Sequence, residues 1–256
     1  MPGRLSRRVG RLLGSARRDD FRRFFEQYPI GPTIGVDAVV EEKLKLVTGL
    51  GRADSLRDFG GLWGVCGRYL LEGAKALGAS YAEMIDVTPQ EEFDRRARQL
   101  ESGMPITVKM LWRDFQNPAL YAELRKVDVS LLYDVLLHQD NADLVIKKVI
   151  ETTARAICVA QPVITEELFA LPNGGVNLQL YPNELKDAIR CPVFWPPEPP
   201  LERFITSAWM WGQTVSFLTT MFTGYGWERS HLRVFHVSDY WQYAFLRFTP
   251  IEKTDE

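Results

Sequence analysis

The hydrophobic pattern of the chain changes its period several times between residues 55 and 160. Short apolar runs of strand length alternate with segments in which apolar side chains recur every three or four positions, as on one face of a helix. Such alternation with short connections predicts a mostly parallel sheet with helices on both faces. The expected strands are 56–59, 81–85, 106–111, 127–133 and 154–159, and the helices between them are 65–77, 89–101, 119–125 and 142–153.

The last third of the chain departs from this alternation. Residues from about 162 to 202 are rich in proline, glycine and asparagine, which is typical of a lid or an acceptor-binding insertion. Residues 203–222 predict one long helix. Residues 232–237 and 240–248 predict two strands, and the tight connection at Ser238–Asp239 favours an antiparallel hairpin.

The first 50 residues have a different character. Eight arginines lie between Arg4 and Arg23, and apolar side chains share helical faces there. We therefore divide the chain into a basic helical extension, 1–50, and a main domain, 51–256, and expect a short second helix at 36–47. Two interpretations of the extension remain open: it packs on the domain with its arginines in water, or it contacts an anionic membrane or a protein partner.

Composition narrows the class of protein. The 256 residues carry 31 basic and 33 acidic side chains, a formal net charge of −2, which does not favour a nucleic-acid partner. Three widely spaced cysteines without a CxxC pair argue against a zinc ribbon and a disulfide framework, and they suit a reducing compartment. The sequence shows no apolar run of 18 residues and no secretory signal, so we expect a cytoplasmic protein.

The first candidate ligand site is the turn after the first expected strand. It places Asp58 before glycines at Gly60, Gly61 and Gly64. Glycines there let the backbone approach a ligand closely and open the following helix N-terminus toward it.

Two further candidate sites follow the next two strands. Asp86 ends the second strand, where an acid can hold both hydroxyls of a ribose. Asp114 and Phe115 follow the third, where a carboxylate can accept from an adenine amino group while a ring packs on the base. All three sites lie at carboxyl ends of neighbouring strands, which is where open α/β sheets bind ligands.

In these residues the chain resembles the class I S-adenosylmethionine-dependent methyltransferases. Asp58, Gly60 and Gly64 match the family's first motif, although Leu62 stands where the middle glycine is usual and Gly61 comes one position earlier. Asp86 matches the family's acidic ribose ligand, and Asp114 matches the residue near adenine.

The resemblance extends over residues 55–249. Residues 127–138 look like the family's fourth-strand segment, and 241–245 look like part of its closing hairpin. The resemblance implies a doubly wound, Rossmann-like sheet of seven strands with an antiparallel last strand, and S-adenosyl-L-methionine as the cofactor.

The same resemblance suggests where catalysis occurs. Methyl transfer is an in-line displacement, so the site must orient the nucleophile and exclude water. His138 lies where the family places residues near the methyl group, and an imidazole is a suitable base at neutral pH. Asp134 is the second catalytic candidate. Asp140 and Asp143 could join it around a cation, but dense carboxylates more often mark a helix N-terminus, and we expect no metal.

An acceptor pocket is expected from the late aromatic residues. Five of the seven tryptophans lie between residues 195 and 241, and the alternative is that most of these rings are core. The expected acceptor-binding residues are Trp195, Trp209, Trp211 and Gln213.

The sequence therefore predicts a methyltransferase, with O-methylation of a small polar molecule or saccharide as the favoured reaction. A transfer-RNA nucleobase methyltransferase and a non-catalytic scaffold that retains the fold are the alternatives. The acceptor and the oligomeric state, including a homodimer, stay open, because acceptor pockets are grafted onto shared scaffolds.

Overall fold

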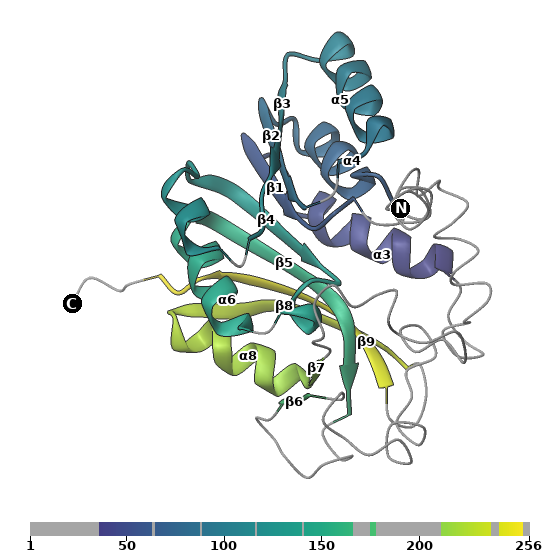
Figure 1. Cartoon of the computed structure of the whole chain (residues 1–256). Helices are drawn as coiled ribbons and strands as arrows, with labels where there is room; N and C mark the ends of the chain where they lie inside the picture. Colours follow the sequence, from purple (N-terminus) through teal and green to yellow (C-terminus); the bar gives the residue numbers. More distant parts are fainter. Residues whose placement is uncertain are drawn as a thin grey trace, which may run out of the picture.

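A computed structural model gives the structure of the chain, and one mostly parallel sheet with helices on both faces dominates it (Figure 1). No described helix is long and apolar enough to cross a membrane. The structure describes residues 36–62, 65–87, 89–115, 117–139, 141–165, 175–177, 211–236 and 241–252.

The main sheet has seven strands in the order β3-β2-β1-β4-β5-β9-β8. The first five are parallel, whereas β9 runs antiparallel to both β5 and β8, so the predicted fold class is confirmed. After β1 the chain adds β2 and β3 on one side of the sheet and then returns to add β4 and β5 on the other side. The carboxyl ends of β1 and β4 are therefore the topological switch point. The strands are β1 Ser55–Phe59, β2 Tyr81–Asp86, β3 Thr107–Trp112, β4 Val127–Tyr133, β5 Thr153–Ile164, β8 Trp227–His236 and β9 Trp241–Pro250.

Helices cover the two faces of the sheet in separate groups (Figure 1). One face packs against three helices, and the other packs against two helices and two 3-10 turns. The first group is α3 Val36–Thr48, α4 Arg68–Leu77 and α5 Glu91–Gly103; the second is α6 Ala142–Glu151, α8 Val215–Gly224, η1 Pro118–Ala122 and η2 Leu136–His138.

Helix α3 belongs to the same packed unit as the sheet. It confirms the helix expected at 36–47, and its side chains Val39, Leu46 and Val47 are buried in the core beside α4. The basic segment before it, residues 1–35, lies outside the described residues.

The long helix expected at 203–222 is wrong in its described part. Residues Trp211–Gln213 form strand β7, which pairs antiparallel with β6, Gly175–Asn177. Helix α8 begins only at Val215, because the Thr214 side chain accepts a hydrogen bond from the Phe217 amide at 3.0 Å and caps the helix. Residues 203–210 lie outside the described part.

Strand β5 is longer than the expected 154–159. It continues to Ile164 by pairing with β9, so residues 162–164 belong to the sheet and not to the insertion. Pro162 is tolerated there because the pairing with β4 ends at Ala160, which leaves this end of β5 with one strand neighbour.

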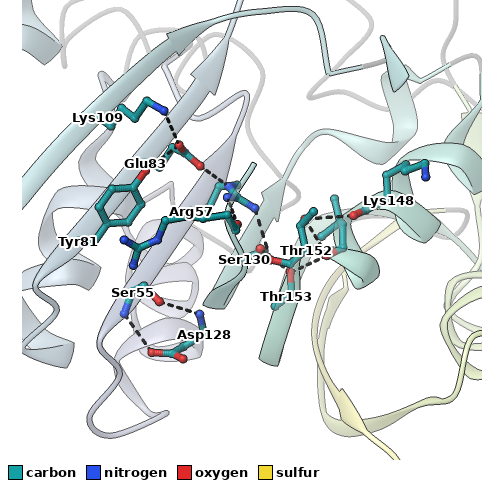
Figure 2. A network of polar contacts seen from close by, with 12 residues as sticks. Ser55, Arg57, Tyr81, Glu83, Lys109, Asp128, Ser130, Lys148, Thr152 and Thr153 are labelled. Carbon is teal, nitrogen blue, oxygen red and sulfur yellow. Dashed lines mark hydrogen bonds and ion pairs between the residues drawn. The ribbon is translucent and has the colours of Figure 1, made fainter. Parts of the chain in front are cut away.

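A buried ion pair crosses two central strands (Figure 2). Arg57 on β1 lies opposite Glu83 on β2, its Nε donates to Glu83 Oε2 at 2.6 Å, and both side chains are at most 1% exposed. The guanidinium also donates to the Arg125 carbonyl at 2.6 Å, and Tyr81 donates to Glu83 at 2.8 Å. These contacts satisfy charges that water cannot reach.

Candidate functional site

The turn after β1 is built from backbone that only small residues allow. Gly60 has a φ of +72°, and its amide donates to the Ile85 carbonyl at 2.8 Å. A Cβ on Gly61 would lie 2.0 Å from Oδ2 of Asp58, so the carboxylate occupies the space where a side chain would be. Asp58, Gly60 and Gly61 are thus brought together as predicted from the sequence, while Gly64 lies outside the described residues.

Asp86 connects the end of β2 to this turn. One carboxylate oxygen accepts from the Leu62 amide at 3.2 Å and the other from the Val87 amide at 2.7 Å. The Leu62 side chain is 1% exposed and packs in the core. A leucine therefore fits at the position where the family that the sequence resembles usually has a glycine, because the side chain points into the apolar cluster and the amide donates to Asp86.

Asp58 has a fully buried carboxyl group for which the described residues supply no good hydrogen-bond partner. Neither oxygen forms a hydrogen bond of good geometry with the described residues, although the nearby Phe59 amide slightly lowers the pKa. Burial raises the pKa of Asp58 well above its ordinary value, and the charge of Asp86 raises it further, whereas the charge of Lys43 lowers it. An unpaired buried carboxyl is costly, so it indicates a site kept for a ligand.

The raised pKa of Asp58 makes the folded state less stable as the pH rises. The folded protein holds this proton above the ordinary pKa of 3.8, where the unfolded chain releases it, so stability falls with rising pH from there up to the raised folded pKa. We expect Asp58→Asn to unfold a few degrees higher than the native protein near neutral pH. The difference should vanish toward about pH 4 in thermal unfolding followed by circular dichroism. A difference independent of pH would contradict this origin.

Phe115 approaches the same turn from β3. Its ring meets Phe59 edge-on at 6.0 Å between centroids and lies 3.7 Å from where a Gly60 Cβ would be. Tyr121 fixes the position by donating to the Phe115 carbonyl at 2.7 Å. Asp114 precedes it and is exposed at the carboxyl end of β3, so both predicted residues lie at the expected edge of the sheet.

Asp134 is the first residue after β4 and has a strained backbone. Its φ is +56°, a left-handed conformation, and its amide donates to the Ala160 carbonyl at 2.8 Å. The carboxylate forms an ion pair with the Lys43 ammonium and accepts a hydrogen bond from the Tyr243 hydroxyl. Two partners therefore hold the Asp134 carboxylate in place. The other catalytic candidate, His138, lies four residues later in η2 and is half-buried.

Lys43 is a site residue that sequence reasoning missed. Its side chain is 1% exposed, and its ammonium lies over three tyrosine rings, 5.2 Å from the centroid of Tyr69, 5.7 Å from Tyr133 and 5.4 Å from Tyr243. A signal was present: Lys43 lies on the helical stripe that Val39 and Val47 define, where an apolar residue is expected.

Of the four residues expected to bind the acceptor, only Gln213 has a described side chain. Gln213 is 1% exposed, and its side-chain amide makes two hydrogen bonds within the protein. The amide oxygen accepts from the Gln161 side chain at 2.6 Å, and the amide nitrogen donates to the Leu136 carbonyl at 3.4 Å. Gln213 thus ties β7 to the sheet. Trp211 lies in β7 without a described side chain, and Trp195 and Trp209 lie outside the described residues.

A metal site was also considered at the end of β4. Within the described ranges, no three histidine, cysteine, aspartate or glutamate side chains are placed to hold a metal ion. Asp143 instead accepts a hydrogen bond from Tyr225 at 2.7 Å, and Asp140 is outside these ranges.

Comparison with solved structures identifies the fold. An O-methyltransferase family protein from Burkholderia thailandensis is 14% identical with a TM-score of 0.57, and the match covers 97% of this chain and 68% of that one. The N-methyltransferase NodS from Bradyrhizobium japonicum, in complex with S-adenosylhomocysteine, is 13% identical with a TM-score of 0.54 over 96% and 98%.

A third solved structure agrees with these two. Magnesium protoporphyrin IX methyltransferase from Synechocystis, with bound S-adenosylhomocysteine, is 13% identical with a TM-score of 0.53 over 96% and 99%. Neither the protein-family models nor the curated proteins gave a match. The chain therefore has the fold of the class I methyltransferases, as its sequence predicted.

Proposed function

We propose that the protein is an S-adenosyl-L-methionine-dependent methyltransferase that holds its donor at the carboxyl ends of β1, β2 and β4. The observation that carries this proposal is the turn at Gly60 and Gly61. It lies at the switch point of the sheet, it is anchored by Asp86 through the Leu62 amide, and it covers the unpaired Asp58 carboxyl. The glycine turn, a cradle that has no room for a Cβ at Gly61, lets backbone approach a nucleoside closely. The buried Asp58 carboxyl, for which the described residues supply no partner, suits a ligand that carries a positive charge.

The residues at this edge suit different parts of the donor. Asp86 ends β2 beside the glycine turn, and a carboxylate at this place is the group that can accept from both hydroxyls of a ribose. In this proposal Phe115 packs on the adenine and Asp114 accepts from its amino group, which is supported by the contact of the Phe115 ring with the Gly60 turn. The bound donor supplies an electrophilic methyl group on a sulfonium.

We further propose an oxygen acceptor, on a small polar molecule or saccharide, with His138 as the base. A hydroxyl must lose its proton as it attacks, and imidazole is the side chain that most often takes a proton at neutral pH. His138 lies half-buried after the carboxyl end of β4. Asp134 is less suited to this task because Lys43 and Tyr243 already bind its carboxylate. The solved structures of this fold include O- and N-methyltransferases, so the acceptor atom is argued from these side chains alone.

The test of this function is methyl transfer from labelled S-adenosyl-L-methionine to a panel of acceptors. The panel holds saccharides, small polar hydroxyl compounds, amines and transfer RNA. We expect labelled methyl ethers of a hydroxyl acceptor and no label in the RNA. Label in transfer RNA would favour the nucleobase alternative, and label in an amine would contradict the oxygen acceptor. Donor binding without transfer to any acceptor would favour the scaffold alternative.

Gly61→Ala tests the cradle directly. The added Cβ would lie 2.0 Å from the Asp58 carboxylate, so either the turn or the carboxylate must move. Because the turn approaches the donor with its backbone, we expect at least a tenfold loss of affinity for S-adenosylhomocysteine in calorimetric titration, about 1.4 kcal/mol. Gly103→Ala is the control, because a Cβ there meets nothing within 4 Å. Equal affinities of the two variants would contradict the assigned cradle.

A further inference from the structure

The surroundings of Lys43 contain polar groups that the described residues leave unsatisfied. An ammonium can donate three hydrogen bonds, and within the described ranges Lys43 makes one, to Asp134. The Asp58 carboxyl and the Tyr69 hydroxyl are buried without hydrogen-bond partners among the described residues. Buried groups of both kinds are usually paired, so this cluster is incomplete without a ligand.

The unsatisfied groups belong to one electrostatic neighbourhood. The charge of Lys43 acts on Asp58, and the charges of Asp134 and Asp58 both raise the pKa of the Tyr69 hydroxyl. The Lys43 ammonium lies over the Tyr69 and Tyr133 rings, which exclude water from it. Asp134 has a 22% exposed side chain, so the cluster is accessible at the carboxyl end of β4.

The missing partner must supply an acceptor and a cationic donor together. Among the described residues, Lys43 has one acceptor for its three N–H groups, and the Asp58 carboxyl has no hydrogen-bond partner. A free α-amino acid group carries a carboxylate and an ammonium on one carbon, so it can meet both needs. An ammonium beside Asp58 also favours release of the carboxyl proton, which a lone anion would oppose.

We propose that Lys43 binds the carboxylate of the amino-acid end of the donor, and that Asp58 and Asp134 face its ammonium. This inference rests on the proposed function and adds to it a binding residue from α3, a helix outside the segment that resembles the family. Helix α3 thereby closes the donor site, and the site distinguishes complete donors from adenosine compounds that lack the amino-acid end.

The test compares two ligands on two variants of the full chain. S-Adenosylhomocysteine carries the amino-acid end, and 5′-deoxy-5′-methylthioadenosine lacks it. We expect Lys43→Met to weaken S-adenosylhomocysteine tenfold to a hundredfold, because a hydrogen bond to a charged group contributes about 1.5–3 kcal/mol. The affinity for methylthioadenosine should change by less than a factor of about three. Lys45→Met is the control, because Lys45 lies on the same helix with its side chain 62% exposed.

A second measurement compares two donors that differ only in the carboxylate. The native protein should bind S-adenosyl-L-methionine at least tenfold more tightly than decarboxylated S-adenosyl-L-methionine, and Lys43→Met should remove that preference. Equal weakening of both ligands by Lys43→Met would give Lys43 a purely structural role and overturn the inference. Equal affinities of the native protein for S-adenosyl-L-methionine and its decarboxylated form would also overturn the inference. If the native protein binds none of these adenosine compounds, the proposed function itself fails.

Discussion

Asp86→Ala is expected to lower the affinity for S-adenosylhomocysteine by roughly a hundredfold to ten-thousandfold. The carboxylate anchors the Leu62 amide of the glycine turn, and under the proposed function it also accepts from the ribose. Hydrogen bonds to a charged group contribute about 1.5–3 kcal/mol each, so losing two of them costs about 3–6 kcal/mol. Calorimetric titration of the native and variant proteins measures the loss.

The matched control for Asp86 is Asp54→Ala. Asp54 precedes β1 at the opposite end of the sheet, and its side chain is 77% exposed. This variant should bind S-adenosylhomocysteine with native affinity. If Asp86→Ala retains native affinity while remaining folded, the ligand is not bound at the end of β2.

Arg57→Met is expected to destabilise the protein by about 3–5 kcal/mol, because it removes the buried charge that pairs with the Glu83 carboxylate at 2.6 Å. Glu83 is 1% exposed and, among the described residues, would keep only the longer ion pair to the half-exposed Lys109, at 3.7 Å (Figure 2). For a chain of this size the loss corresponds to roughly 6–20 °C in the midpoint of thermal unfolding. Circular dichroism on heating measures it.

Two further variants distinguish the effect of the buried unpaired charge from the effect of altered packing. The double variant Arg57→Met/Glu83→Gln should recover much of the loss, because no unpaired charge then remains buried. Arg95→Met breaks an exposed contact with Glu92 and should leave the midpoint of thermal unfolding nearly unchanged, because water screens this ion pair. A double variant as unstable as the single one would show that packing, and not charge, dominates at this position.

The alternating part of the fold was predictable because its signals are local. Strand β4 has the predicted bounds, and Gly78 ends α4 in a left-handed conformation, as a glycine C-cap predicts. Strand β7 was missed because three residues give no period of their own and take their conformation from pairing with β6. The extension of β5 was missed because Pro162 usually ends a strand, and only the pairing with β9 shows that it does not.

The residues of the candidate site also differ in whether local sequence patterns could predict them. Asp58, Gly60 and Asp86 were found because each follows an apolar run at a strand end. Lys43 and Tyr243 were missed because they lie 91 and 109 residues from Asp134 in the sequence, and only the folded chain brings them to it. Local patterns therefore located the strand-end residues of the candidate site, and only long-range packing shows the partners of Asp134.

We propose above all that this chain binds an S-adenosyl donor at the switch point of its sheet. The decisive measurement is calorimetric titration of the purified full chain with S-adenosylhomocysteine. We expect one binding site per chain with micromolar affinity, about −8 kcal/mol. If the folded protein does not bind the ligand, the proposed donor site is wrong.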